Sequence, residues 1–377
     1  MTTDPTNETA EQLRVELGPR SYDIVIARGP AAGLGRFVRE RLDGGRTAGE
    51  TPRVLLVSDA HLEALGMVEH ARESLERAGV LAACVVLPAG ESTKSLEHAV
   101  ALYDALVRAR ADRRWGIVAL GGGVIGDLAG FVAATYARGL PLVMVPTTLL
   151  AQVDSSVGGK VGVNHPAAKN IIGAFHQPRG VWIDVTFLNS LPDRAFRSGL
   201  AEVVKYGVIL DASFFEELER DRAAILARSP ERLARIVAHS CRLKARVVEQ
   251  DEREETGLRA VLNFGHTIGH AIESTAGYGA YEHGEAVAAG MAAEARLAER
   301  LGWLEPPAVK RLVDLIEHFG LPTRAPGLDP DLLIDAMTRD KKNRAGRIHF
   351  VLPTTLGRVE LTDRPSVDDV RAILATL

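Results

Sequence analysis

The sequence predicts a two-domain protein, with an α/β domain in the first half of the chain and a mainly α-helical domain in the second. Its 377 residues are enough for two separate cores. Strand-like apolar runs alternate with helical stretches as far as residue 184, which indicates parallel strands joined by helices. From residue 185 onward helical periodicity dominates. We expect a flexible tail over residues 1–12, the α/β domain over 13–184 and the helical domain over 185–377.

The first half begins with two strand-like runs, LRVEL and YDIVIA, separated by GPRS, and this pattern predicts a hairpin. Further buried strands are expected at Val54–Asp59, Ala83–Pro88, Trp115–Leu120 and Leu142–Pro146, with one more at Trp182–Asp184. Helices are expected from Asp59 to about Ala78, over Ser95–Arg110 and over Ile125–Tyr136.

The second half reads as a succession of helices followed by a short β-like pair and a last helix. The helices are expected at Arg194–Val208, Phe214–Leu226, Pro230–Gln250, Leu258–Thr275, Glu285–Leu301, Pro307–Phe319 and Asp329–Arg339. The β-like pair, RIHFVL and RVEL, lies near Arg347–Leu361, and the last helix near Val367–Ala375. A cleft between an α/β domain and a helical domain is a common place for a ligand.

The composition excludes several classes of protein. Hydrophobic residues make up 46% and the net charge is −4, so the chain lacks the basic surplus of nucleic-acid binders. No apolar run approaches the roughly 18 residues of a membrane span, and the polar start MTTDPTNETAEQ lacks the apolar core of a signal peptide. The two cysteines, Cys84 and Cys241, lie far apart and favour a reducing compartment. We therefore expect a cytoplasmic protein.

Three histidines are concentrated in one segment, Leu262–Gly290, which reads LNFGHTIGHAIESTAGYGAYEHGEAVAAG. His266 and His270 stand four apart in a helical pattern and so lie on one helix face, and His283 follows shortly after. Neutral imidazole is a common zinc ligand, so the segment predicts a metal site. A helix face with a capping histidine and no metal remains the alternative.

A glycine-rich turn between a strand and a helix predicts a nucleotide phosphate site. GGGVIGD (Gly121–Asp127) allows close backbone approach, and the helix start offers free N–H groups to a phosphate. Its three consecutive glycines depart from the spaced dinucleotide fingerprint. Asp59, at the end of an expected strand, suits a ribose hydroxyl. A tight turn without a nucleotide is the alternative.

The segment between Asp154 and Gln177, DSSVGGKVGVNHPAAKNIIGAFHQ, suits a loop that wraps an anionic ligand. It holds Lys160 and Lys169 among glycines, with Asn164 and Asn170 nearby, and ammonium and amide groups bind phosphate or carboxylate. Solvated lysines are the alternative here, as they are for the later basic set that includes Lys341 and Lys342.

Several motifs together resemble the 3-dehydroquinate synthase family of the sugar-phosphate cyclases, from about Arg53 to Leu361. They are GGGVIGDLAGFVAATYARG, PTTLLAQVDSSVGGKVGVNHPAAKNIIGAFHQP, GLAEVVKYGVILD, LNFGHTIGHAIE, HGEAVAAGM and DKKNRAGRIHFVLP. The resemblance implies an NAD-binding α/β domain, a mainly helical metal- and substrate-binding domain, and an active site between them. It also implies conversion of 3-deoxy-D-arabino-heptulosonate 7-phosphate (DAHP) to 3-dehydroquinate and phosphate, by transient oxidation with NAD, phosphate elimination, reduction and aldol closure. This reaction belongs to the shikimate pathway of aromatic amino-acid biosynthesis.

The resemblance also assigns residues. The ligands of Zn²⁺ or Co²⁺ would be Glu202, His266 and His283, and the choice of Glu202 rests on the resemblance alone. The catalytic residues would be His270, now facing the substrate, with Asn263, Lys160, Lys205 and Asp154. Substrate contacts would come from Arg138, Lys169, Asn170, Lys244, Arg259 and one of Lys341 or Lys342. NAD⁺ contacts would come from Asp59, Glu91, Lys94, Gly123, Val124, Ile125, Gly126, Asp127, Thr147, Thr148, Lys160, Lys169, Phe187, Leu188, Asn189 and Ser190.

The family resemblance further implies a homodimer in which Arg138 reaches the neighbouring site. Plainer roles stay open for some residues: Glu202 as a solvated helix acid, Asp154 as a cap, Thr147 and Thr148 as turn residues, and Glu91 with Lys94 as a helix N-terminal box. Other activities also stay open. They are a valiolone- or inosose-type sugar-phosphate cyclase, a polyol dehydrogenase of related fold, and a catalytically silent homologue.

Overall fold

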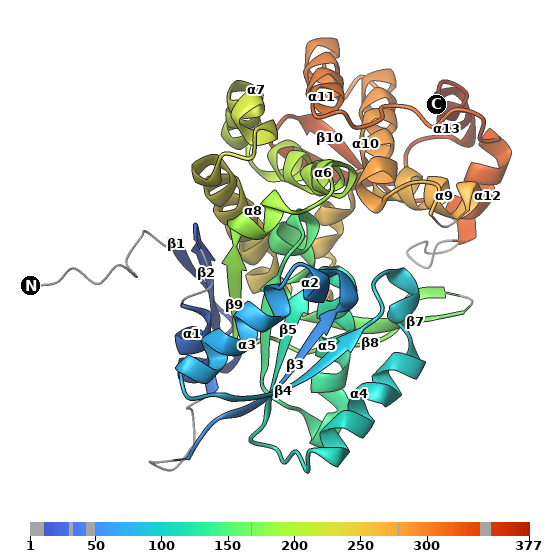
Figure 1. Cartoon of the computed structure of the whole chain (residues 1–377). Helices are drawn as coiled ribbons and strands as arrows, with labels where there is room; N and C mark the ends of the chain where they lie inside the picture. Colours follow the sequence, from blue (N-terminus) through green and yellow to red (C-terminus); the bar gives the residue numbers. More distant parts are fainter. Residues whose placement is uncertain (1–10, 30–32, 43–49, 167, 278, 340–347) are drawn as a thin grey trace, which may run out of the picture. The chain divides into compact units, whose positions relative to one another are not determined.

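The computed structural model describes residues 11–29, 33–42, 50–166, 168–277, 279–339 and 348–377 (Figure 1). The chain divides into two compact units. The first comprises Met1–Leu191 with Leu233–Arg253, and the second comprises Pro192–Arg232 with Glu254–Leu377. The division differs from a single boundary at residue 185, because most of helix α8 (Pro230–Gln250) belongs to the first unit. Among the described residues, no helix has the length and apolar character that a membrane span requires.

The first unit is built on a seven-stranded sheet in the order β1-β2-β9-β6-β5-β3-β4. The strands are β1 (Glu11–Val15), β2 (Tyr22–Ala27), β3 (Arg53–Asp59), β4 (Leu81–Leu87), β5 (Gly116–Gly121), β6 (Leu142–Pro146) and β9 (Gly180–Asp184). β1 and β2 form the predicted antiparallel hairpin, and all the other pairings in this sheet are parallel. The predicted parallel α/β sheet is therefore confirmed.

Helices cover this sheet because its inner strands β3, β5, β6 and β9 are apolar and buried on both faces. They are α1 (Leu34–Leu42), α2 (Ala60–Ala64), α3 (Met67–Arg77), α4 (Leu96–Arg108) and α5 (Gly123–Thr135). On one face, Leu56, Val118 and Trp182 of the sheet form a core with Phe37 of α1 and Leu75 of α3. The single helix expected up to Ala78 is wrong, because Gly66 adopts a left-handed conformation (φ 73°) between α2 and α3.

The expectation of an anion-wrapping loop over residues 154–177 is wrong in its secondary structure. Lys160–His165 (β7) and Ala168–Phe175 (β8) form an antiparallel two-stranded sheet. Val161, Gly162 and Val163 in the middle of β7 are buried, while Lys160 and His165 at its two ends are exposed. Gly130 of α5 permits the close packing of β7, since a Cβ there would lie 2.3 Å from Val161 Cγ1. The predicted lysines therefore stand on a hairpin.

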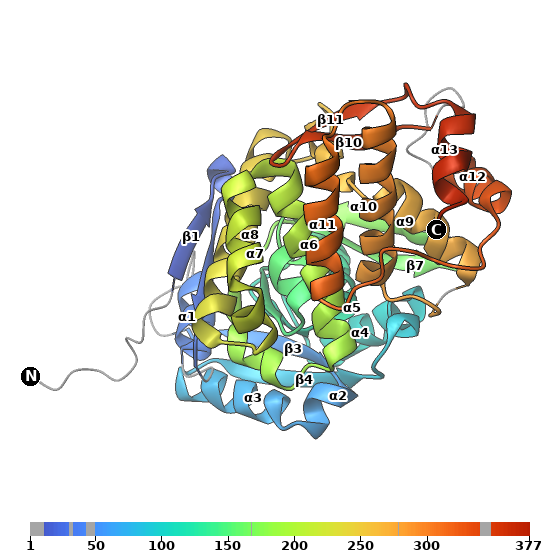
Figure 2. The ribbon, with the colours of Figure 1, turned by 90° about the horizontal axis from the view of Figure 1, so that it is seen from above.

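The second unit is mainly helical, as predicted. Its helices are α6 (Asp193–Leu210), α7 (Ala212–Leu226), α9 (His266–Ala276), α10 (His283–Arg300), α11 (Pro306–His318), α12 (Pro330–Arg339) and α13 (Val367–Leu374), with a hairpin of β10 (Phe350–Thr355) and β11 (Arg358–Thr362). Helices α6, α10 and α11 run side by side (Figure 2), and α10 also packs on α9, α13 and β10. The residues Ala286–Ala295 of α10 are all buried, and the alanines and Gly290 among them let the neighbouring helices approach closely.

One helix expected over Leu258–Thr275 is wrong, because the chain breaks in the middle of that range. A 3₁₀ helix, η6 (Leu258–Asn263), ends before Phe264, and Gly265 adopts φ 79°. A side chain at Gly265 would collide with Met291 of α10, since a Cβ would lie 2.4 Å from Met291 Cγ. The break makes His266 the first residue of α9.

Candidate functional site

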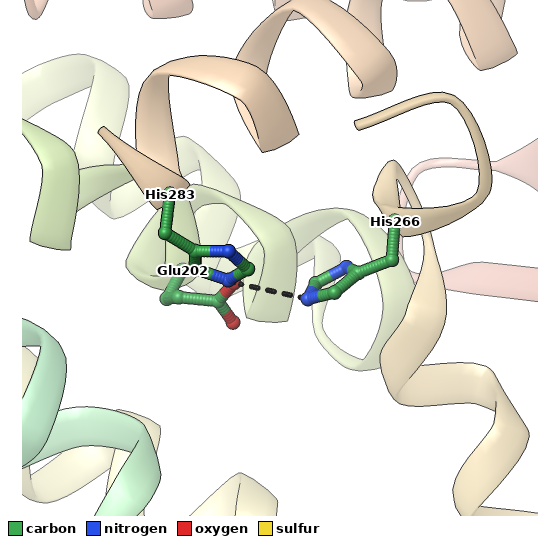
Figure 3. A group of neighbouring side chains, drawn as sticks. All are labelled: Glu202, His266 and His283. Carbon is green, nitrogen blue, oxygen red and sulfur yellow. Dashed lines mark ion pairs between the residues drawn. The ribbon is translucent and has the colours of Figure 1, made fainter. Parts of the chain in front are cut away.

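Three potential metal ligands meet in the second unit, each from a different helix (Figure 3). Glu202 lies within α6, while His266 and His283 are the first residues of α9 and α10. Glu202 Oε1 lies 3.5 Å from His266 Nε2 and 3.8 Å from His283 Nε2. One donor atom from each residue lies within 4.8 Å of the others.

Each imidazole has an oxygen acceptor beside its Nδ1, on the side away from the centre of this cluster. His266 Nδ1 lies 3.1 Å from the carbonyl oxygen of Phe264, and His283 Nδ1 lies 3.3 Å from Glu273 Oε2. Because both neighbours are acceptors, each Nδ1 carries the proton and each Nε2 keeps its lone pair. Both lone pairs then face Glu202. A neutral imidazole with its other nitrogen so hydrogen-bonded is the usual form of a metal-binding histidine.

The third donor, Glu202, is a fully buried carboxylate. It forms an ion pair with Lys205 one turn further along α6, yet neither of its oxygens accepts a hydrogen bond of ordinary geometry. Burial of an incompletely compensated carboxylate is costly, and a divalent cation would offset that cost. Two imidazole nitrogens and one carboxylate oxygen are a donor set that suits Zn²⁺ or Co²⁺ with a position left for substrate. The residues therefore fit a catalytic metal.

Close packing of α6 against the start of α10 sets the spacing between Glu202 and His283. Gly284, next to His283, donates its N–H to Ser198 Oγ at 3.0 Å, one turn before Glu202. A Cβ on Gly284 would lie 1.9 Å from the carbonyl oxygen of Ser198. Arg194, a further turn back on α6, holds Glu285 by two hydrogen bonds of 2.8 and 2.7 Å.

A second buried carboxylate, Glu294 of α10, fixes the start of α9 and hence His266. Its Oε2 accepts from Gly265 N–H at 2.7 Å, and its Oε1 accepts from Ile268 N–H at 3.2 Å. These N–H groups belong to the first turn of a helix, where the helix itself offers no acceptor. The negative charge also lies at the positive end of the α9 dipole.

The remaining predicted residues of this unit lie near the cluster or on the same elements. The His270 ring centroid lies 5.3 Å from that of His266 and 6.1 Å from that of His283. His270, Glu273 and His283 form a second group of potential ligands that shares one histidine with the first. Burial opposes protonation of His283, but the hydrogen bond and charge of Glu273 raise its pKa above the ordinary value. Arg259 is buried in η6, which ends at Asn263.

In the first unit, polar and glycine residues follow the carboxyl ends of neighbouring parallel strands. β3 ends at Asp59 and β5 ends at Gly121, and these two strands are adjacent in the sheet. The chain leaves β3 toward β4 on one side and leaves β5 toward β6 on the other. Such a divergence creates a crevice outside the strand ends, where ligands of open α/β sheets bind.

The glycine-rich turn leads directly into α5, which starts at Gly123 with Gly122 as its N-cap. No side chain caps this end, and the first intrahelical hydrogen bond runs from Gly126 N–H to Gly122 O at 3.0 Å. The N–H groups of the first turn are therefore oriented toward an incoming anion. Asp59 caps α2 instead, accepting from His61 and Leu62 through Oδ1 alone.

Other predicted contacts of this unit gather around Asn164 of β7. Its side chain donates to Glu91 Oε1 at 2.8 Å, and its backbone N–H donates to the carbonyl oxygen of Lys94 at 2.9 Å. Lys94 forms a buried ion pair with Asp127 of α5. Burial raises the pKa of Asp127, and the charge of Lys94 opposes this rise.

The other predicted residues are dispersed over the first unit. Lys160, Lys169 and Asn170 are exposed on the β7–β8 hairpin, and Arg138 is exposed at the end of 3₁₀ helix η3 (Tyr136–Arg138). Thr147 and Thr148 follow β6, and Thr147 N–H bonds to Gly121 O at 3.0 Å. Phe187, Leu188, Asn189 and Ser190 lie in and just after 3₁₀ helix η5 (Val185–Asn189). Lys341 and Lys342 lie outside the described residues.

Two carboxylates that contact the elements of this cluster, Glu273 and Glu294, were not predicted from the sequence. Glu294 stands alone in the apolar run GMAAEARLA, and an isolated acid on an otherwise buried helix is a signal that could have identified it. Glu273 lies about two turns after His266 on α9, but nothing in that spacing indicates that it faces His283.

Comparison with known proteins agrees with this geometry. Family models for the N-terminal and C-terminal parts of 3-dehydroquinate synthase match residues 84–198 and 199–343. A 3-dehydroquinate synthase of Desulforamulus reducens is 50% identical over 364 residues, covering 96% of this chain and 99% of that protein.

Two solved structures also resemble the chain. One is the 2-epi-5-epi-valiolone synthase of Streptomyces hygroscopicus with NAD⁺ and Zn²⁺ bound (TM-score 0.83, 29% identity, 96% of this chain and 97% of that one). The other is a 2-deoxy-scyllo-inosose synthase complexed with carbaglucose-6-phosphate, NAD⁺ and Co²⁺ (TM-score 0.85, 26% identity, 97% and 99%). The fold is thus that of the sugar phosphate cyclases. Within this class, the chain belongs to the 3-dehydroquinate synthase family.

Proposed function

We propose that the chain converts DAHP to 3-dehydroquinate and phosphate as an NAD⁺- and divalent-metal-dependent lyase of the shikimate pathway. The main support for the metal dependence is the convergence of Glu202, His266 and His283, in which Nε2 of each histidine faces the carboxylate. When bound there, Zn²⁺ or Co²⁺ acts as a Lewis acid that makes a substrate hydroxyl easier to deprotonate.

NAD⁺ would bind at the carboxyl edge of the first unit's sheet. The unshared N–H groups at the start of α5 suit its pyrophosphate, and Asp59 Oδ2 suits a ribose hydroxyl, since the capping bonds use Oδ1. NAD⁺ is bound in two similar structures, which supports the choice of cofactor. The remaining contacts would come from Glu91, Lys94, Gly123, Val124, Ile125, Gly126, Asp127, Thr147, Thr148, Lys160, Lys169, Phe187, Leu188, Asn189 and Ser190.

The substrate carries a carboxylate and a phosphate, and local positive charge would bind both in a protein of net charge −4. His270 would hold or relay a proton with Asn263, because imidazole titrates near neutral pH. Asp154, Lys160 and Lys205 complete the catalytic set. The substrate-binding set comprises Arg138, Lys169, Asn170, Lys244, Arg259 and one of Lys341 or Lys342.

The working form would be a cytoplasmic homodimer, with Arg138 contributed to the partner's site. One face of α4 supports an interface, because it carries exposed apolar side chains at helical spacing: Leu96, Val100 and Val107. Between them, Tyr103 stacks on Tyr136, two residues before Arg138, at a centroid distance of 6.5 Å. Light scattering should give twice the chain mass for the wild type and the chain mass for Val100→Asp. Glu97→Gln, on another face of α4, should remain dimeric.

The decisive assay is phosphate release from DAHP with trace NAD⁺, before and after chelation. Release that stops on chelation and returns with zinc or cobalt supports the proposal, and release that survives thorough chelation contradicts it. Turnover of a heptulose phosphate without the carboxylate, in place of DAHP, would indicate a valiolone-type cyclase, and turnover of a hexose phosphate an inosose-type cyclase. Net NADH formation with a polyol would indicate a dehydrogenase, since the cyclase regenerates NAD⁺.

A further inference from the structure

His283 stands between two carboxylates, one on each side of its imidazole ring. Its Nε2 faces Glu202 Oε1 at 3.8 Å, and its Nδ1 faces Glu273 Oε2 at 3.3 Å. The other histidine of the cluster, His266, has its Nδ1 against a backbone carbonyl, which no substitution of a side chain removes. The orientation of His283 therefore depends on a side chain, and that of His266 on the main chain.

We propose that Glu273 is a positioning residue of the metal site, which selects Nε2 of His283 as the ligand atom. This inference rests on the metal dependence proposed above. Glu273 accepts the Nδ1 proton, so the Nε2 lone pair points toward Glu202 and His266. An imidazole that donates to a carboxylate is also a more basic ligand.

The burial of these side chains explains why His283 needs such support. The His283 side chain is 33% exposed, against 12% for His266 and 14% for Glu273. His283 is the first residue of α10, and the buried residues of that helix begin only at Gly284. A half-exposed imidazole that lacks an orienting partner can turn either nitrogen toward the metal, and this freedom has an entropic cost when the metal binds.

The placement of Glu273 also couples the two ligand helices. His266 and Glu273 lie about two turns apart on α9 and therefore on the same face, while His283 begins α10. One rigid helix thus supplies a ligand and orients the ligand of its neighbour. Loss of Glu273 should affect the metal without altering any donor atom.

A competing role for Glu273 is that of a ligand. With His270 and His283 it forms a group whose donor atoms lie within 4.8 Å of one another. Nδ1 of His283 cannot both donate a proton to Glu273 and bind a second ion, so the two roles predict different metal stoichiometries. A positioning role gives one ion per chain, and a ligand role gives two.

The test measures Zn²⁺ affinity by chelator competition, and the visible spectrum and stoichiometry of bound Co²⁺, on the full chain without substrate. Glu273→Ala should bind one ion about 10–100-fold more weakly than the wild type, with an altered Co²⁺ spectrum. Glu273→Gln should recover most of the affinity, because its amide oxygen still accepts the Nδ1 proton. Ser274→Ala, an exposed neighbour on α9, should match the wild type.

Each other outcome has a definite meaning. If the wild type binds neither Zn²⁺ nor Co²⁺, the proposed metal dependence itself is wrong. If the wild type binds one ion and Glu273→Ala has the same Zn²⁺ affinity and Co²⁺ spectrum as the wild type, the positioning role is wrong and the metal dependence stands. Two ions in the wild type and one in both Glu273→Ala and His270→Ala would make Glu273 a ligand. If Glu273→Ala fails to fold by circular dichroism, Glu273→Met decides, because it keeps the length of the side chain but offers no oxygen acceptor: a roughly 10–100-fold loss of affinity relative to Glu273→Gln supports the inference, and equal affinity contradicts it.

Discussion

Lys244 of α8 donates two hydrogen bonds to Asp154, one to its carbonyl oxygen at 2.6 Å and one to Oδ1 at 2.7 Å. One turn earlier on α8, Cys241 Sγ lies 3.2 Å from the carbonyl oxygen of Gln152. These contacts hold α8 against the turn of residues 151–155, although about 90 residues separate them. A residue proposed to bind substrate therefore also stabilises the first unit.

We expect Lys244→Met to lower the free energy of unfolding by about 1–3 kcal/mol, because two partly buried hydrogen bonds from a charged donor are lost. Turnover should fall as well. Urea denaturation monitored by circular dichroism measures the first effect, and phosphate release the second. Arg246→Met, exposed on the same helix, is the matched control. Wild-type stability in Lys244→Met would show that these bonds contribute nothing to the fold.

His270 of α9 should respond differently from His283 when each is replaced by alanine. His283→Ala should lose metal together with turnover, because a direct ligand is removed. His270→Ala should keep the metal and lose about 10²–10⁴-fold in turnover, the usual contribution of a positioned proton-transfer group. Metal content after dialysis, measured beside phosphate release, separates the two. An empty metal site in His270→Ala would show that the assigned roles are wrong.

Glu294→Ala should destabilise the second unit. It removes the acceptor of two buried N–H groups, those of Gly265 and Ile268, at a cost of about 1–3 kcal/mol for each unsatisfied group. Metal affinity should fall too, because His266 starts the helix that Glu294 caps. Urea denaturation with and without saturating zinc measures both effects. Glu299→Ala, less buried on the same helix, should change neither; if its loss equals that of Glu294→Ala, the cap has no special role.

His176 should make stability depend on pH below neutrality. Burial lowers its pKa, although its Nε2 lies 2.9 Å from Leu140 O, which favours the protonated form. Because the folded-state pKa is below the unfolded-state value of about 6.5, the unfolded chain binds the proton more readily. Its contribution to stability is therefore complete above pH 6.5 and is lost as the pH falls through the folded-state pKa. Urea midpoints between pH 7 and 5 should fall less steeply in His176→Gln, and parallel curves would contradict this.

Much of the fold was predictable because its signals are local. Apolar runs such as Val54–Asp59 and Trp115–Leu120 identify strands by themselves, and the alternation with helices gives their parallel pairing. The β7–β8 hairpin was missed since its lysines and asparagines outweighed the short alternation around Val161. The break at Gly265 was missed because its cause, Met291, lies on another helix. The return of α8 to the first unit depends on long-range contacts such as Lys244 to Asp154.

The site residues likewise divide into those with a local signal in the sequence and those that depend on contacts between distant segments. The spacing of the histidines proposed His266, His270 and His283 as candidate ligands, and only the family resemblance set His270 apart. Glu202 lies in a different motif, and only the resemblance selected it among 49 acidic residues. Glu273 and Glu294 were not predicted, because their contacts with His283 and with the start of α9 form only when α9 and α10 pack together. Spacing along one helix predicts which side chains share a face, but it cannot predict which residue of another helix will meet them.

The segment of α10 between His283 and Glu294 cannot accept insertions or deletions. The two residues lie about three turns apart, so both face α9, one beside its metal ligand and the other at its first turn. Insertion or deletion of a single residue between them would rotate one by about 100° relative to the other and separate the ligand from the cap. A substitution in this segment leaves the relative orientation of His283 and Glu294 unchanged, whereas a change in the length of the segment does not.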